Sequence, residues 1–352
     1  MTRKVQHHLL SKAKKNKNDE FYTQLIDIES ELQYYKKHFK GKVVYCNCDD
    51  PFESNFFRYF VLNFNRLGLK SLITTSYKSS PVANTQVGLF GNEKTLQLEK
   101  GRPKPTANKF VINSVGDIDG DGLLNLQDIA EQLKANKHNE WEPLEGDGDF
   151  RSEECVELLK QSDIVVTNPP FSLFRDYVAQ LVKYEKSFLI IGNINAITYK
   201  EIFNLIKEDG AWLGVNLGRG ISGFIVPEHY ELYGTEAKID ELGNRIISPN
   251  NCLWLTNLDN SIRHEDIILN KKYYGNEHEY PKYDNYDGIN VNKTKDIPLD
   301  YKGYMGVPIT FLHKYNPEQF EIVKFRKGDD EKDLSINGKC PYFRILIRNK
   351  RL

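Results

Sequence analysis

The sequence lacks any run of residues long and apolar enough to cross a membrane. Its first residues are basic, but they are not followed by the apolar segment that a secretory signal peptide needs. These two absences argue against a membrane-spanning or secreted protein. We therefore expect a cytoplasmic protein.

Cysteine is scarce and shows no pairing pattern. The five cysteines are an odd number spread along the chain, and Cys46 and Cys48 have no second pair to complete a four-ligand zinc site. We expect all of them to be reduced thiols, which excludes a disulfide scaffold.

An excess of either charge is also absent. The chain holds 48 Lys and Arg against 49 Asp and Glu, so its formal net charge is −1. This balance does not exclude nucleic-acid binding, because a local basic face suffices to contact phosphates. Aromatic residues are common, with 20 Tyr and 19 Phe, and such side chains both fill cores and stack on bases.

Hydrophobic spacing predicts an α/β fold. Apolar positions recur every three or four residues over 24–39 and 54–69, as in helices, and short apolar runs over 42–46 and 71–75 predict strands. This order is that of a doubly wound, mostly parallel sheet. Further elements are expected as a helix at 152–160, a strand at 163–167, a helix at 173–184, a strand at 187–191 and a helix at 202–207.

One short segment carries the strongest chemical signal. The apolar strand that begins at Asp163 runs into Asn168-Pro169-Pro170-Phe171, and open α/β sheets bind ligands at the carboxyl ends of their strands. Consecutive prolines fix φ and restrict the preceding residue, so the oxygens of this tetrapeptide are held in place. Taken alone the tetrapeptide indicates a rigid turn, but after a buried strand it indicates a catalytic site.

These residue types suit methyl transfer to an exocyclic amine of a base. Such an amine is a poor nucleophile because its lone pair is delocalised into the ring. The side-chain oxygen of Asn168 and the carbonyl of Pro169 can both accept from its hydrogens, and preorganised dipoles of this kind stabilise a transition state. Phe171 can stack on the face of the displaced base.

The segment resembles motif IV of the amino-methyltransferases, and the wider sequence resembles the EcoRI-type adenine-specific modification methyltransferases. The resemblance covers residues 18–60 and 146–352. The segments that carry it are Asp19–Thr23, Val43–Pro51, Gly146–Arg151, Ser162–Phe174, Ser222–Pro227, Asn285–Pro298 and Asp333–Ile345. It implies transfer of a methyl group from S-adenosylmethionine to N6 of an adenine flipped out of double-stranded DNA. Such an enzyme is typically the modification enzyme of a type II restriction-modification system, with the cognate endonuclease as a functional partner.

The sequence also predicts a domain organisation. We expect residues 1–18 to form a basic flexible arm, because they carry no acid. We expect 19–211 to form a Rossmann-like S-adenosylmethionine-dependent domain with an insertion over about 78–145, where periodicity is weak and the resemblance is absent. Residues 212–352 add the remaining strands and a lobe that reads the target. We expect a monomer, because a monomer can modify each strand of a palindrome in turn.

The resemblance implies cofactor contacts in three places. The segment Phe21-Tyr22-Thr23 resembles the motif that meets the methionine part of the cofactor. Asn47, Asp49 and Asp50 follow the first strand, where motif I lies, although the usual Gly-x-Gly is missing here. The segment Asp149-Phe150 resembles the motif that meets the adenine of the cofactor, where a carboxylate can accept from the amino group.

The positions of two further residues suggest that they contact the substrate. Phe224 matches the place where the family sets an aromatic ring against the flipped base, opposite Phe171, and ordinary core packing explains it equally well. Arg219, between two glycines, is a candidate for binding a phosphate or is simply a surface arginine.

A second signal falls within the insertion. Residues 117–128 fit the spacing of a calcium loop, with Gly122 at the sharp turn. The expected ligands are Asp117, Asp119, Asp121, the Leu123 carbonyl, Asn125 and Asp128. A structural calcium site and an acidic surface turn both remain open, and methyl transfer itself needs no metal.

Basic residues at both ends of the chain are candidates for contacting DNA. The N-terminal arm carries six lysines and arginines and no acid: Arg3, Lys4, Lys12, Lys14, Lys15 and Lys17. In the C-terminal lobe the candidates are Lys293, Lys295, Lys339, Arg344 and Arg348, each of which a solvated surface also explains. As a group they predict binding that weakens with salt.

Other functions remain open at this point. An Asn-Pro-Pro-aromatic site also suits cytosine N4, RNA adenine or a protein glutamine amide as the acceptor. The missing motif I glycines leave room for a non-catalytic DNA-binding protein on the same fold. The calcium-type loop leaves room for a calcium-dependent interaction protein.

Overall fold

A computed structural model describes residues 22–48, 54–76, 107–117, 128, 138–216, 223–226, 232, 237–240, 243–247 and 251–352. The chain divides into two compact units. The larger takes in residues 1–196 and 216–258, and the smaller takes in 197–215 and 259–352. The chain therefore enters the smaller unit, returns and enters it again, whereas the sequence predicted one boundary near residue 211.

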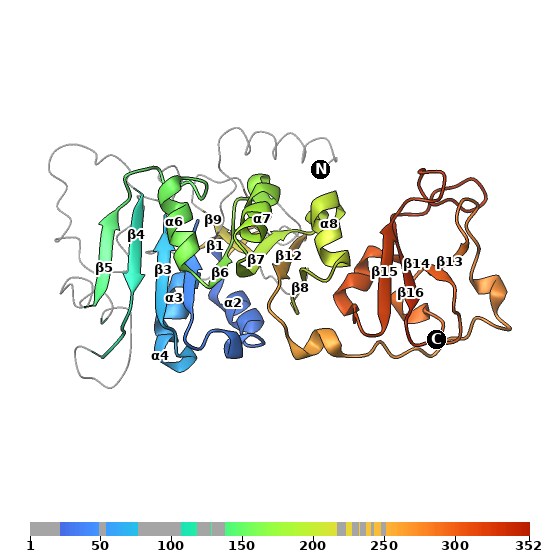
Figure 1. Cartoon of the computed structure of the whole chain (residues 1–352), viewed down its shortest axis with the longest axis horizontal. Coiled ribbons are helices and arrows are strands. Elements are labelled where there is room, and N and C mark those ends of the chain that lie inside the picture. Colours follow the sequence, from blue (N-terminus) through green and yellow to red (C-terminus); the bar gives the residue numbers. More distant parts are fainter. Residues whose placement is uncertain are drawn as a thin grey trace. The chain divides into compact units, whose positions relative to one another are not determined.

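The larger unit is an α/β structure built on a central sheet (Figure 1). Its helices are α2 (Leu25–Leu32), α3 (Asn55–Leu62), α4 (Phe64–Leu67), α6 (Glu153–Gln161) and α7 (Phe174–Lys183), with 3-10 helices at Lys36–His38 and Phe171–Leu173. A further 3-10 helix, Ile194–Thr198, includes the point where the chain passes into the smaller unit. The sheet strands are β2 (Val43–Cys46), β3 (Ser71–Thr75), β4 (Asn108–Ile112), β5 (Asn139–Pro143), β6 (Ile164–Thr167), β7 (Ser187–Asn193) and β12 (Cys252–Thr256). They lie in the order β5-β4-β3-β2-β6-β7-β12.

The four strands at the centre of this sheet, β3, β2, β6 and β7, are parallel, and β4, β5 and β12 extend it with antiparallel pairings. The predicted α/β class with a large, mostly parallel sheet is confirmed. A second sheet of the larger unit lies in the order β1-β9-β11-β10. Its strands are β1 (Tyr22–Thr23), β9 (Phe224–Val226), β11 (Arg245–Ile247) and β10 (Lys238–Ile239).

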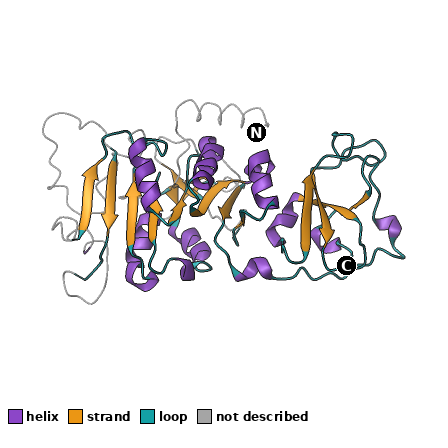
Figure 2. Cartoon of the chain, viewed as in Figure 1, coloured by secondary structure: helices purple, strands orange, loops and turns teal. Residues whose placement is uncertain are grey.

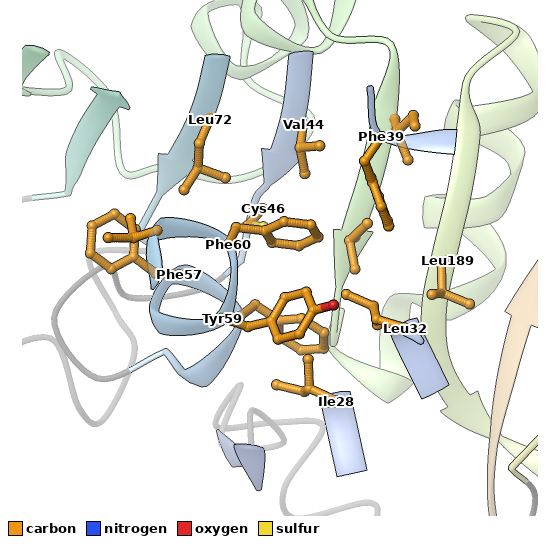
Figure 3. Packing of buried hydrophobic residues seen from close by; sticks show 14 of the residues in the cluster. Ile28, Leu32, Phe39, Val44, Cys46, Phe57, Tyr59, Phe60, Leu72 and Leu189 are labelled. Atoms are coloured by element: carbon orange, nitrogen blue, oxygen red, sulfur yellow. The ribbon is translucent and has the colours of Figure 1, made fainter. Parts of the chain in front are cut away.

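Helices cover both faces at the centre of the sheet, so β2, β3 and β6 are buried on both sides. Helices α2, α3 and α4 lie on one side, and α6 and α7 on the other (Figure 1). Successive residues of a strand point to opposite faces. In β2, Val44 and Cys46 belong to the apolar core that includes α2 and α3, whereas Tyr45 meets Cys155 of α6. Figure 3 shows side chains of α2 and α3 gathered against the strands that carry Val44 and Leu72.

Local sequence sets where these helices begin and end. Ser54 precedes α3, and its hydroxyl accepts from the backbone N–H groups of Phe56 and Phe57. Ser152 caps α6 in the same way, because serine oxygens satisfy N–H groups that a first helical turn leaves unpaired. Gly68 ends α4 in the left-handed conformation, at φ 64°, which glycine adopts without a steric cost.

The smaller unit contains one short sheet (Figure 2). Its strands lie in the order β13 (Gly288–Asn290), β14 (Tyr304–Pro308), β16 (Arg344–Asn349) and β15 (Phe320–Phe325). The unit also holds α8 (Lys200–Lys207), β8 (Trp212–Leu213) and 3-10 helices at Ser261–His264, Glu277–Glu279, Thr294–Asp296 and Ile309–Lys314. Phe203 of α8 stacks on Phe325 of β15, with ring centroids 5.0 Å apart. Strands, turns and 3-10 helices make up the described residues after α8.

Two general expectations can be compared with the described residues. Within those ranges, no helix combines the length and the apolar character needed to cross a membrane. Cys46, Cys155 and Cys252 are buried, Cys340 is exposed, and all five cysteines are free thiols.

The apolar core beneath the sheet predicts one stability effect. Phe60 of α3 is fully buried, and its ring lies 5.2 Å from that of Phe39. Phe60→Ala should lower the free energy of unfolding by about 3–5 kcal/mol, because it leaves a cavity in a close-packed core. Chemical denaturation measures the change. Leu62→Ala, at an exposed position of the same helix, should change it by less than about 1 kcal/mol, and equal losses would contradict this account.

Candidate active site at the carboxyl ends of the central strands

The candidate residues gather where three parallel strands end. Asn47 follows β2, Ser76 follows β3, and Asn168 follows β6. Tyr45 of β2 is in register with Val165 of β6 on one side and with a residue of β3 on the other. The three strand ends therefore lie beside one another at the sheet edge where α/β proteins bind ligands.

The Asn-Pro-Pro-Phe segment forms the turn from β6 into the next helix. Asn168 is 5% exposed, and Pro169 and Pro170 are buried. Pro170 precedes the 3-10 helix Phe171–Leu173, which leads into α7. The motif thus lies in the strand-turn-helix setting that a catalytic interpretation requires.

Asn47, where motif I was expected, is held by two residues that sequence reasoning missed. The Thr167 hydroxyl donates to the Asn47 carbonyl, and the Tyr177 hydroxyl donates to the Asn47 side-chain oxygen. Cys48 follows with φ 63°, in the left-handed region that favours glycine. A non-glycine residue therefore takes the left-handed conformation at Cys48, and hydrogen bonds from β6 and α7 hold Asn47 next to it.

Asp149 and Phe150 lie in a loop that packs against the end of β3. The Asp149 carboxylate accepts from the backbone N–H of Arg151 (2.9 Å), from its Nε (2.9 Å) and from its Nη2 (2.7 Å). The same guanidinium lies over the Phe150 ring, 5.2 Å from its centroid. A carboxylate can accept about four hydrogen bonds, so Arg151 takes up much of its capacity and fixes its orientation.

Phe150 also contacts α7, the helix that follows the Asn-Pro-Pro-Phe segment. Its ring meets that of Tyr177 edge to face, with centroids 5.0 Å apart. The Gln180 side chain donates to the Phe150 carbonyl over 3.0 Å. One face of α7 thereby joins the Asn47 loop to the Phe150 loop, and Tyr177 contacts both.

The segment before α2 and the strand that carries Phe224 lie together. Thr23 pairs with Phe224 between β1 and β9, and the Asn55 side chain donates to the Thr23 carbonyl over 2.8 Å. Phe224 is fully buried, and its ring meets Phe171 edge to face, with centroids 6.1 Å apart at 73°. Phe224 is thus a core residue in this structure, and its role against a base stays a prediction.

Ionisable groups beneath the strand ends carry no charge at neutral pH. Burial raises the pKa of Tyr45 well above its ordinary value, and its hydroxyl lies 3.0 Å from that of Thr75. Burial also raises the pKa of Cys155. Both groups are therefore protonated at pH 7, which leaves hydrogen-bonding dipoles as their contribution to the site.

Some predicted residues lie outside the described part of the chain. They are the arm over 1–18, Phe21, Asp49, Asp50, Arg219 and the calcium-loop positions Asp119, Asp121, Leu123 and Asn125, and nothing is described of the Tyr22 side chain. Of the proposed calcium ligands, the structure describes Asp117 and Asp128. Among described residues no group of three or more His, Cys, Asp or Glu is placed to hold a metal ion. The calcium site that the sequence left open finds no support among the described residues.

A cavity of about 310 Å³ lies at the opposite edge of the sheet. Its lining includes Lys42, Asp163 and Lys186, near the amino ends of β2, β6 and β7. Ligands of open α/β sheets bind at the carboxyl ends, so this cavity is not the candidate site.

The basic residues predicted to contact DNA differ in exposure. Lys293, Lys295 and Lys339 are exposed, and Arg348 is exposed but paired with Glu321 over 2.6 Å. Arg344 is 8% exposed, and its Nε donates to Asn290 over 2.9 Å. The expectation that Arg344 is a surface cation is therefore wrong, because β16 carries it into the interior of the smaller unit.

The family is decided by comparison with known proteins. Residues 9–350 match the model of a family described as adenine-specific methyltransferase EcoRI. The chain belongs to the EcoRI family of adenine-specific methyltransferases. No solved structure matches it.

Curated members of this EcoRI family extend along the whole chain. The chain is 63% identical to the type II methyltransferase M.EcoRI of Escherichia coli, over all of this chain and 99% of that protein. It is 38% identical to M.MpnI of Mycoplasma pneumoniae, over 98% of this chain and 99% of the relative. It is 34% identical to a type II methyltransferase of Mycoplasma genitalium, over 98% of this chain and all of the relative. The predicted family and enzyme class, a DNA methyltransferase, are confirmed, and methyltransferases of this kind use S-adenosylmethionine.

The loop before Phe150 generates a prediction about glycine in this EcoRI-family site. Gly148 has φ 77°, and a Cβ there would lie 2.0 Å from the backbone oxygen of Ser76. Gly148→Ala should therefore lower the free energy of unfolding by about 1–3 kcal/mol or displace the loop. Denaturant unfolding and the near-ultraviolet spectrum report the two effects. A Cβ at Gly146 meets nothing within 4 Å, so Gly146→Ala is the matched control, and equal behaviour of the two variants would refute the argument.

Proposed function

We propose that this chain transfers a methyl group from S-adenosylmethionine to N6 of an adenine flipped out of duplex DNA. We assign it to the modification side of a type II restriction-modification system. The observation that carries the proposal is Asn168-Pro169-Pro170-Phe171 at the carboxyl end of β6, beside Asn47 at the end of β2. The names of the relatives, M.EcoRI and M.MpnI, support the type II assignment.

The residues present suit the cofactor in three respects. The buried ring of Phe150 beside the Asp149 carboxylate suits an adenine with an exocyclic amino group. Asn47, at the end of the neighbouring strand, lies where α/β sheets receive nucleotide ligands. Thr23, in the segment that resembles the methionine-binding motif, is buried, and its carbonyl accepts from the Asn55 side chain of α3. When bound, S-adenosylmethionine supplies an electrophilic methyl group on its sulfur.

The chain's own residues act on the acceptor base. The Asn168 side-chain oxygen and the Pro169 carbonyl accept from the two hydrogens of N6, which draws the nitrogen toward a tetrahedral, nucleophilic geometry. The buried setting of both residues strengthens these dipoles, since little water competes with them. Phe171 is half-buried, packs against the apolar core and stacks on the base. The nitrogen loses its proton after transfer, so no strong general base is required.

The acceptor is tested by incubating the protein with labelled S-adenosylmethionine and unmethylated duplex DNA. Nucleoside mass analysis should find N6-methyladenine. Labelled N4-methylcytosine would correct the base and keep the mechanism, whereas transfer to RNA or protein alone would overturn the proposal.

We further propose that a monomer acts on each strand in turn and that the endonuclease is a functional partner without a physical contact.

Asn168 provides the direct test of the catalytic assignment. Asn168→Ala removes one of the two acceptors aimed at N6, so kcat should fall by at least about a hundred-fold. Binding of S-adenosylmethionine, measured by calorimetry, should change little. Asn204→Ala, at an exposed position of α8, is the matched control and should leave kcat unchanged. Near-normal turnover of the Asn168 variant would refute the role.

Tyr177 is proposed as a positioning residue for the cofactor. Tyr177→Phe keeps the ring against Phe150 but leaves the buried Asn47 oxygen without this donor, so the dissociation constant of S-adenosylmethionine should rise about ten-fold. At saturating cofactor, kcat should stay within about two-fold of the wild type, because Asn168 is untouched.

Tyr184→Phe, at the end of the same helix, is the matched control and should leave the dissociation constant unchanged. An unaltered dissociation constant for Tyr177→Phe, or an equal rise in the control, would refute the role of the hydroxyl.

A further inference from the structure

The smaller unit has an exposed loop between β15 and β16, and this loop contains a tight turn. Ile336 and Lys339 exchange backbone hydrogen bonds of 2.9 and 3.0 Å across this turn. The two residues between them, Asn337 (φ 48°) and Gly338 (φ 71°), are both left-handed, as in the two-residue turns of β-hairpins. The turn is exposed from Asn337 through Cys340.

A carboxylate from another segment holds this turn in place. Asp284 accepts from the backbone N–H groups of Asn337 (3.0 Å) and Gly338 (2.8 Å) and from the Ser335 hydroxyl (3.0 Å). The bond from the Gly338 N–H and those from the other donors hold the pKa of Asp284 below its ordinary value. The tip is therefore fixed before any partner arrives, and preorganised contacts lose less entropy on binding.

Tyr342 lies on the same loop and is one of the most exposed aromatic side chains described, at 71%. Its ring stacks on Phe343, with centroids 5.3 Å apart at 28°. Phe343 is in turn held by the Arg326 guanidinium, 4.2 Å from its ring centroid, and by the edge of Phe325. A rigid stack thus presents the outer ring to solvent, although burial of an aromatic ring is ordinarily favourable.

The two arginines beside this aromatic stack differ in whether they have a carboxylate partner. Arg326 is neutralised by Asp333 at 2.7 and 3.0 Å. Arg344, directly after the stack, donates to the Tyr342 carbonyl over 2.6 Å and otherwise to Asn290 and Asn292. In the described part of the chain, no carboxylate lies within 4.0 Å of a charged nitrogen of Arg344 or Lys339. A buried guanidinium without a counter-charge raises the local positive potential.

We propose that this loop, Leu334–Phe343, is a DNA-docking element in which Lys339 contacts a backbone phosphate and Tyr342 stacks on a sugar or base. The inference rests on the proposed function, because it names the duplex substrate as the partner. Two cations without a carboxylate within ion-pair distance, Lys339 and Arg344, lie beside an exposed, rigid aromatic ring, and this combination is complementary to a polyanion that offers flat, apolar faces. The buried Arg344 is a positioning residue that fixes the Tyr342 backbone and adds to the field.

The test measures DNA binding without requiring methyl transfer. A fluorescent duplex oligonucleotide of random sequence is titrated with Lys339→Ala, Tyr342→Ala and Tyr342→Phe at several salt concentrations. Tyr342→Ala should weaken DNA binding roughly ten-fold. Tyr342→Phe should bind DNA as tightly as the wild type, because the ring and not the hydroxyl makes the contact. Lys339→Ala should weaken binding and lower the slope of log K against log salt by about one.

Matched controls come from the same unit. Tyr274 is 63% exposed and Lys302 is exposed, so Tyr274→Ala and Lys302→Ala should leave binding and slope unchanged. The melting temperatures of all variants and their affinity for S-adenosylmethionine should match the wild type. With plasmid DNA, the KM for DNA should rise in the Lys339 and Tyr342 variants while kcat stays unchanged.

The outcomes separate this proposal from the proposed function. Unchanged duplex binding in Lys339→Ala and Tyr342→Ala, or equal losses in the two controls, would overturn the docking element even where the wild type makes N6-methyladenine. A wild type that binds duplex through these residues but makes no methylated base would overturn the proposed function and leave the docking element standing.

Discussion

The parallel pairing of β2 with β6 is the constraint on which the rest of the larger unit depends. Their register, Val44 with Ile164 and Tyr45 with Val165, sets the two strand ends side by side. The Thr167 hydroxyl donates to the Asn47 carbonyl, so the segment that follows β2 lies against the start of the Asn-Pro-Pro-Phe turn. A shift of the pairing by one residue would exchange the two faces of a strand. The helices on each side of the sheet would then pack against side chains that belong to the other face. Core packing therefore fixes the geometry of the site.

The same pairing explains how Cys48, directly after Asn47, adopts a left-handed conformation without being glycine. A left-handed residue other than glycine is unfavourable by itself, and it persists when its surroundings over-determine it. Cys48 meets this condition, because Asn47 before it is held from two directions by Thr167 and Tyr177. Tertiary hydrogen bonds here replace a local sequence signal, which is why an absent Gly-x-Gly does not by itself indicate a lost function.

Sequence reasoning was most accurate for the short apolar runs that predict strands. The periodic stretch over 24–39 predicted one long helix, whereas α2 ends at Leu32. The strand expected at 71–75 coincides with β3, and the strand expected at 163–167 differs from β6 by one residue. Tyr177 was missed because its bond to Asn47 joins residues 130 positions apart, and nothing in a single sequence marks such a pair. Arg344 was misplaced for a related reason: a basic residue in a strand looks like surface until its buried amide partners are known.

The net charge of −1 is compatible with DNA binding because carboxylates in the smaller unit neutralise specific cations. Asp333 takes up Arg326 and Lys327, Asp266 takes up Arg351, and Glu321 takes up Arg348. The cations available to bind a polyanion are then those without a carboxylate partner. The net charge of the whole chain has little influence on them. Exposed pairs are screened at physiological salt, whereas a buried guanidinium is screened much less, so Arg344 should keep its effect where the surface pairs contribute little. A chain with balanced charge can in this way confine its attraction for DNA to a small part of its surface.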